Sequence, residues 1–437
     1  MFVVWLFCIL AFIILPFKLE TRILSFIGFF YLAGHIICFA AGAVATAPLT
    51  QSIGSTNKML PDLQRVDKLL LGTSMTVVIL LLAVIAQGNF LDLASAYSAR
   101  DARAGEVLNG VSGGGNTLFQ IAFLLYPAAF VCLSREVIFR KEIKLLRLFL
   151  LAILPIILVS IVMGGRGPML YAIGVLLLSY KARSQIFGKP RRRILGLKLT
   201  PRKLVSYTAV GTLALVAFNY FVTVFIVRAA GVGGTSEMYN IAAQDWGVSF
   251  DGAGSQWLIS TIGQGNAYLV YVFIWYLIQG LIMSNQIFSA YDGPNGLGIY
   301  GFDLVTAVVR RVDGQAVTNV FYPLLDMNVY GFLPSAFGSL YVDFGPFSFV
   351  AVVLWGCLAG LVFQRIRESI DARWVLLGPF VSVGIFFSLI NTPLGFGNGL
   401  VTHFWLILSF LVARKGRIAG INVRGPRGHS LNRERFG

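Results

Sequence analysis

Long apolar runs, separated by short polar stretches, make up most of this chain. Most of these runs are long enough to cross a ~30 Å hydrocarbon core as an α-helix. A membrane interior offers no water to unpaired backbone groups, so spanning segments of this kind are helical. We therefore predict an all-α polytopic membrane protein with about ten transmembrane helices. The predicted spans are 2–17, 23–46, 68–87, 117–134, 148–163, 168–180, 205–228, 344–363, 374–392 and 398–413.

The segment 229–343 departs from this regular alternation. Its stretch 266–283 is apolar enough to span, but a crossing there would place all the basic residues that follow on the outer side. We therefore predict that 229–343 is one long periplasmic segment, with helices that re-enter the membrane or lie along its surface. Irregular backbone at membrane depth is tolerated inside protein or beside a watery cavity, so this segment is expected to roof a cavity. A glycine-rich outer loop is predicted at 88–116.

The composition supports a membrane protein, with 57% hydrophobic and 12% charged residues. Ten spans with both termini in the cytoplasm would place the basic loops and the basic tail inside, as the positive-inside rule requires. The net charge of +16 then reflects anionic lipid headgroups as neighbours and predicts no nucleic-acid partner. We predict one transmembrane domain, 1–413, and a disordered cytoplasmic tail, 414–437. The basic loops are 49–67, 135–147, 181–203 and 365–373.

Apart from Lys18 and Arg22 in a short turn, the basic residues predicted to lie outside are arginines. Arginine suits phosphate because its planar fork donates paired, charge-assisted hydrogen bonds and stays protonated. A transporter would use such residues as a charge filter, whereas an enzyme would use them to hold a pyrophosphate leaving group. Arg228 ends a predicted span and is interpreted as an interfacial anchor. The outer arginines are Arg100, Arg103, Arg166, Arg228, Arg310 and Arg311.

The sequence Gly164-Gly165-Arg166-Gly167-Pro168 predicts a tight hairpin at the outer membrane boundary. Glycines permit unusual φ values and close backbone approach, and proline fits the first turn of the following helix. A lone arginine in such a turn is poorly explained by packing. We interpret Arg166 as a phosphate-binding residue, with an interfacial anchor as the alternative.

Two further groups in the outer segment are candidates for chemistry. Arg310 and Arg311 follow the apolar stretch 302–309, where they would either cap an amphipathic helix or face the cavity. Asp343 is predicted to lie where the eighth span begins. It would act there as an N-cap or as a carboxylate at the cavity floor, near the arginines. Tyr341 is a candidate substrate contact beside it.

Other motifs carry less information. His403 is predicted near the outer end of the last span, where it would face the cavity or pack between helices. The match to G-x-G-x-x-G at 296–301 has no preceding strand, so we interpret it as chance. The four cysteines lie in apolar spans without metal-ligand spacing, and we predict no metal site and no cofactor.

With these residues in place, the chain resembles the Wzy-type O-antigen and oligosaccharide repeat-unit polymerases of bacterial inner membranes. The resemblance is carried by the Gly-Gly-Arg-Gly-Pro hairpin, the long outer segment, the basic-loop layout and two short motifs. These motifs are Asn328-Val329-Tyr330 and Leu340-Tyr341-Val342-Asp343-Phe344-Gly345.

The resemblance implies a metal-independent, GT-C-like glycosyltransferase acting at the periplasmic face. Its substrates would be undecaprenyl-pyrophosphate-linked oligosaccharides, and a chain-length regulator protein would be a further partner. It implies Arg166, Arg310, Arg311 and Asp343 as catalytic residues, with Tyr341, Asn328, Arg103 and His403 as further substrate contacts. An O-antigen ligase and a transporter or flippase for lipid-linked sugars remain alternatives. The absence of an internal repeat and the scarcity of mid-span charges disfavour transport.

Overall fold

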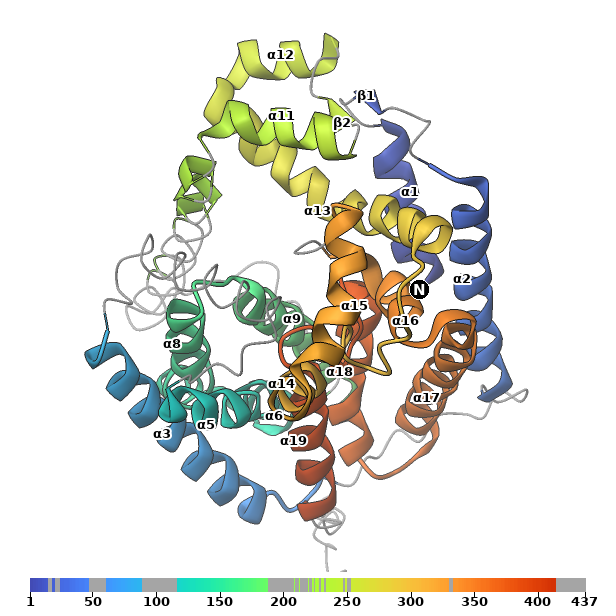
Figure 1. The fold of residues 1–437 in the computed structure, drawn as a ribbon. Coiled ribbons are helices and arrows are strands. Elements are labelled where there is room, and N and C mark those ends of the chain that lie inside the picture. The colour runs from blue at the N-terminus through green and yellow to red at the C-terminus, as the bar shows by residue number, and fades with distance from the viewer. Residues whose placement is uncertain are drawn as a thin grey trace, which may run out of the picture.

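The computed structural model describes residues 1–14, 18–19, 24–46, 60–88, 116–187, 233–246, 248–249, 253–329 and 333–413, with scattered positions between 208 and 231 (Figure 1). The first half contains α1 Phe2–Ile14, β1 Lys18–Leu19, α2 Phe26–Thr46, α3 Gln64–Ala86, α5 Thr117–Leu125, α6 Ala128–Phe139, α7 Leu145–Leu148, the π-helix η2 Phe149–Ile153, α8 Leu154–Val162 and α9 Gly167–Phe187. The second half contains α11 Thr235–Trp246, β2 Val248–Ser249, α12 Ala253–Ile262, α13 Gln264–Ala290, α14 Asp303–Val312, α15 Gly314–Asp326, α16 Ser335–Phe344, η3 Gly345–Phe347, α17 Ser348–Glu368, α18 Arg373–Phe386, η4 Phe387–Leu389 and α19 Gly399–Val412.

The predicted class of helical, multi-span membrane protein agrees with this architecture. In the part of the chain that the structure describes, six helical stretches are long and apolar enough to cross a membrane. Three shorter apolar helices coincide with predicted spans, and α9 covers the predicted span 168–180. Most of the predicted span 205–228 lies outside the described residues. The six stretches are Phe26–Thr46, Gln64–Ala86, Thr117–Phe139, Leu145–Val162, Gln264–Ala290 and Ser335–Glu368.

The apolar stretch 266–283 forms part of a long helix. This stretch lies in α13, a helix of 27 residues that is long and apolar enough to cross a membrane. Much of α13 is buried between α1, α2 and α16. This agrees with the expectation that the stretch is apolar enough to span, and whether 229–343 stays on one side of the membrane remains a prediction.

The backbones of helices α2 and α17 come so close together that only glycine fits at the points of contact. A Cβ at Gly42 would lie 2.2 Å from the carbonyl oxygen of Val353, and one at Gly356 would lie 2.2 Å from that of Phe39. Gly356 and Gly360 form a G-x-x-x-G pattern, which lets two membrane helices bring their backbones together. Such contacts hold membrane helices together because lipid supplies no hydrophobic force between them.

Two buried apolar clusters form the core of the described structure. The first cluster joins α3, α5, α6, α8, α9, α18 and α19, and the second joins α1, α2, α13, α15, α16 and α17. Leu304 of α14 packs against the first cluster, whereas Val305 and Val309 of the same helix pack against the second. Helix α14 therefore lies where the two clusters meet, near the centre of the view in Figure 1.

The basic loop predicted at 135–147 is partly helix. Helix α6 continues to Phe139, and Arg135 is 1% exposed. Arg135 forms ion pairs with Asp67 of α3 and with its neighbour Glu136, which keeps its charge compensated inside the protein. The first part of this predicted loop is therefore a buried ion network and not a solvated surface loop.

Candidate functional site

The carboxylate of Asp343 holds the loop that precedes α14. Its Oδ1 accepts a hydrogen bond from the backbone N–H of Tyr300 at 2.9 Å, and its Oδ2 accepts one from Gly301 at 2.8 Å. The backbone N–H of Gly298 is a further donor to this carboxylate. The loop also pairs with α16 through the backbone, since the N–H of Leu297 donates to the carbonyl of Asp343 at 2.9 Å. Asp343 is thus a buried organiser of the 296–301 loop.

Glycines allow this loop to enclose the carboxylate. A Cβ at Gly296 would lie 2.6 Å from Oδ1 of Asp343, and one at Gly301 would lie 2.7 Å from Oδ2. Gly298 has φ +99°, a conformation that residues with a side chain rarely adopt. The G-x-G-x-x-G spacing at 296–301 therefore has a structural cause unrelated to dinucleotide binding.

The position predicted for Asp343 was wrong in one respect. Asp343 lies in the last turn of α16, and the next long helix, α17, begins only at Ser348 after the 3-10 turn η3. The side chain is 0% exposed and accepts backbone hydrogen bonds on both oxygens. It is neither an N-cap nor an open carboxylate at a cavity floor.

Asp303, which the sequence reasoning did not select, is a more accessible carboxylate. It begins α14, two residues after the 296–301 loop that Asp343 holds, which we call the clamped loop. An acidic side chain at this end of a helix interacts favourably with the helix dipole. The side chain is exposed, yet the protein around it desolvates the carboxylate and raises the pKa of Asp303 to about 6. It lies close enough to Tyr126, in the turn between α5 and α6, to interact electrostatically. Accessibility combined with desolvation is typical of an acid–base group.

Helix α14 presents charge on one side and apolar residues on the other. Asp303, Thr306 and Arg310 are three and four positions apart and share a face of the helix. The opposite side packs toward the two apolar clusters or remains exposed, as Val308 does at 53%. This confirms the predicted amphipathic helix ending at Arg310 and Arg311.

The two arginines of α14 differ in their surroundings. Arg311 is exposed and donates a hydrogen bond from Nη2 to the side-chain oxygen of Gln120 in α5. Arg310 is partly buried, and among the described residues no hydrogen-bond partner meets its buried Nε. A buried N–H without an acceptor destabilises the protein, so an anionic ligand at this position would satisfy it.

The loop between η4 and α19 packs against the clamped loop. Thr392 donates a hydrogen bond to the carbonyl of Gly301 at 3.1 Å, and Asn398 donates one to the carbonyl of Phe123 at 2.8 Å. His403 follows in the first turns of α19, where its Nδ1 lies 2.8 Å from the carbonyl oxygen of Gly399. Helix α19 also contacts α14, and the described hydrogen bond of His403 stays within α19.

Arg166 is built into the protein interior. Gly164 has φ +55°, and Pro168 lies in the first turn of α9, as the hairpin prediction required. The side chain is 7% exposed, with Nη2 donating to the hydroxyl of Tyr276 at 2.9 Å and the guanidinium 3.5 Å from the ring centre of Phe225. These contacts connect the α8–α9 turn to α13 and leave little of the Arg166 side chain exposed.

Tyr341 belongs to an aromatic group around His35. Its ring packs edge-on against Tyr31 and Phe288, at centroid distances of 5.3 and 5.2 Å. His35 stacks on Phe349 at 4.2 Å, and its ring nitrogens lie within hydrogen-bond distance of the Tyr31 carbonyl and the Ser348 hydroxyl. The half-buried Tyr341 therefore has a packing role that accounts for an aromatic residue at this position.

Asn328 has a backbone explanation. It follows α15 with φ +56°, and its N–H donates to the carbonyl of Leu325 while that of Val329 donates to Leu324. This pair of bonds is the Schellman pattern, in which glycine or asparagine takes the left-handed position. Asn328 is exposed, and the end of α15 explains why an asparagine stands there, so its predicted substrate contact stays a prediction.

Arg100, Arg103 and Arg228 lie outside the described residues, so the predicted substrate contact at Arg103 stays a prediction. Asp343 bonds the loop that leads into α14, and α14 carries Asp303 at its start and Arg310 and Arg311 in its last turn. The described contacts of Arg166 go to Tyr276 of α13 and to Phe225. Comparison of the chain with protein-family models, with curated proteins and with solved structures found no match.

Proposed function

We propose that this protein is a membrane glycosyltransferase that polymerises pyrophosphate-linked oligosaccharide repeat units carried by a prenyl lipid. The observation that carries the proposal is α14, which combines the accessible carboxylate of Asp303 with Arg310 and Arg311 where two apolar clusters meet. A lipid-linked sugar substrate needs this combination: an apolar body for the tail and a charged site for the reacting head.

The proposed chemistry has two charge requirements. The acceptor hydroxyl oxygen attacks the anomeric carbon of the growing glycan, and the bond from that carbon to the pyrophosphate oxygen breaks. Asp303 takes the proton of the hydroxyl as general base. Arg310 and Arg311 stabilise the negative charge that develops on the departing pyrophosphate.

Arg310 is the stronger of the two candidates for this electrostatic role. Its buried Nε lacks a described protein acceptor, whereas Arg311 already bonds Gln120. Removal of one preorganised donor to a developing oxyanion costs about 2.7–4 kcal/mol of transition-state stabilisation in enzymes of the oxyanion-hole type. We therefore expect Arg310→Gln to lower kcat by about 10²–10³.

Arg166 keeps a proposed role as a phosphate contact, supported by its place in the Gly-Gly-Arg-Gly-Pro turn. Its bond to Tyr276 and its stacking on Phe225 would hold the guanidinium in one orientation. The proposed location is a bacterial inner membrane with the site facing the periplasm, and the support for this orientation is the charge distribution of the loops.

The decisive experiment adds lipid-linked repeat units to the purified protein in detergent and follows chain length by gel electrophoresis and mass spectrometry. Chain growth without a bilayer supports the polymerase. Transfer only to an added lipid A core identifies a ligase, and lipid binding without any transfer supports a transporter. Asp326→Asn, a change in an exposed carboxylate of α15, is the matched control for Asp303→Asn.

A further inference from the structure

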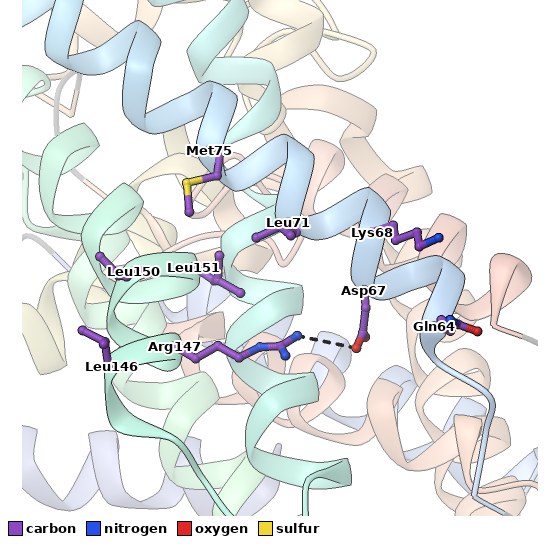
Figure 2. Close-up of a pocket in the computed structure, with 9 residues that line it drawn as sticks. All are labelled: Gln64, Asp67, Lys68, Leu71, Met75, Leu146, Arg147, Leu150 and Leu151. Carbon is purple, nitrogen blue, oxygen red and sulfur yellow. Dashed lines mark hydrogen bonds and ion pairs between the residues drawn. The ribbon is translucent and has the colours of Figure 1, made fainter.

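A groove lies at the end of the molecule where α3 and α7 begin, next to the ion network of Arg135. It has a volume of about 470 Å³ and runs between the first turns of α3 and the segment that includes η2. Figure 2 shows Leu71 and Met75 on one wall and Leu150 and Leu151 on the other, with charged residues at one end.

The walls of this groove are apolar and largely accessible. Met75 is 41% exposed, Leu71 43% and Leu146 72%. All three belong to helical stretches that are apolar enough to span a membrane, so their exposed surfaces suit acyl chains. The widened π-turn of η2 precedes Pro155, which has no N–H to donate to the preceding turn.

Among the described residues, the rim of the groove carries more positive than negative charge. Two carboxylates, Asp67 and Glu136, are shared by three arginines. Arg135, Arg140 and Arg147 each form an ion pair with both carboxylates. Lys68 adds another cation at the rim, and the described residues place no carboxylate in an ion pair with it.

Arg147 connects this charge to the groove. Its Nη2 lies 3.5 Å from Asp67 Oδ2 and 3.3 Å from Glu136 Oε1, and its side chain is 37% exposed. Its Nε is buried, and no described residue accepts a hydrogen bond from it. The guanidinium therefore retains a donor for an additional anionic partner.

We propose that this groove binds an anionic phospholipid from the membrane. One acyl chain lies along Leu71, Met75 and Leu150, and the headgroup phosphate meets Arg147 at the charged end of the groove. Basic pockets between membrane helices bind anionic headgroups in this way. A soluble anion would use the rim alone and leave the apolar walls without a partner.

This proposal does not depend on the proposed enzymatic activity, because its test measures binding and stability. The protein is exchanged from detergent into nanodiscs of phosphatidylcholine alone or with phosphatidylglycerol, and bound lipid is counted by native mass spectrometry. We expect selective retention of phosphatidylglycerol and a higher Tm in its presence. Equal retention and equal Tm in the two lipids would overturn the proposal.

Two variants separate the parts of the site. Lys68→Gln removes a rim charge and is expected to weaken phosphatidylglycerol retention about fivefold. Leu71→Trp fills the groove at an exposed position and is expected to exclude the acyl chain. Lys181→Gln makes the same charge change at an exposed position of α9 away from the groove, and is expected to retain wild-type binding.

The variants also distinguish lipid from a free anion. Retention that falls in Lys68→Gln but not in Leu71→Trp, together with stabilisation by inorganic phosphate, would show an ion site and contradict the lipid proposal. An equal loss in Lys181→Gln would show nonspecific attraction to the charged bilayer and contradict it as well.

Discussion

Asp303 and Asp343 show how two carboxylates of one loop region acquire different roles. Asp343 is enclosed, and the backbone N–H groups of Tyr300 and Gly301 occupy its oxygens. Asp303 is exposed, although desolvation raises its pKa. Because a base must reach its substrate, the accessible Asp303 is the carboxylate that we propose for this role.

We expect the pH dependence of transfer to report Asp303. Its pKa is raised to about 6, so its protonated fraction grows as the pH falls through this value. Because the base acts only when ionised, kcat/KM should fall about tenfold per pH unit below 6. Measurement of kcat/KM from pH 5 to 8 should show this limb in the wild type and in Asp326→Asn.

Asp303→Asn should lower the rate of transfer by about 10²–10⁴-fold. The remaining rate should no longer fall below pH 6. The Tm of this variant should stay near the wild-type value, because the side chain is exposed. An Asp303→Asn protein that keeps both its rate and an unchanged acid limb would remove Asp303 from the mechanism.

The clamped loop is sensitive to a single methyl group. A Cβ at Gly301 would meet Oδ2 of Asp343 at 2.7 Å, so Gly301→Ala must displace the carboxylate or the loop. We expect a loss of about 1–3 kcal/mol in the free energy of unfolding, seen as a lower Tm in detergent. Gly265→Ala is the matched control, because a Cβ there has no neighbour within 4 Å. A Tm of Gly301→Ala equal to that of the control would disprove the clamp.

At the level of elements, the α2–α17 pair depends on close backbone contact. The hydroxyl of Thr46 donates to the carbonyl of Cys357 at 3.0 Å, which becomes possible because Gly356 and Gly360 lie against α2. Membrane helices associate through such packing and through hydrogen bonds between them.

Gly356→Val should separate α2 from α17, since even a Cβ at this position would lie 2.2 Å from the Phe39 carbonyl oxygen. We expect a markedly lower Tm and faster proteolysis in detergent. Gly72→Ala in α3, where a Cβ has no neighbour within 4 Å, should leave the Tm unchanged or raise it slightly. Resistance of Gly356→Val to protease equal to that of Gly72→Ala would show that the close contact does not hold the pair together.

On the scale of the whole molecule, the sequence predicted what local patterns determine. The helix that ends at Arg310 and Arg311, the turn at Gly164 and the start of α9 at Pro168 were all predicted from short-range rules. The helical membrane architecture was predicted from long apolar runs, because the length of each run is enough to identify it as a possible span.

The remaining features depend on contacts between residues that are far apart in the chain. Gly301 meets Asp343 across 42 positions, and Arg166 meets Tyr276 across 110. No periodicity encodes these pairings, so Asp303 and the buried state of Arg166 were not evident from the sequence. The enclosing glycines did give a signal at 296–301, but their spacing was interpreted as chance.

The partnership of α2 with α17 has a consequence for biosynthesis. Thr46 and Cys357 are separated by 311 positions. At about 5–20 residues per second, α2 waits roughly 15–60 s for α17 to leave the ribosome. During that interval the part of α2 around Gly42 lacks α17 as a neighbour. Truncation of the nascent chain before α17 should therefore leave α2 exposed to membrane quality-control proteases.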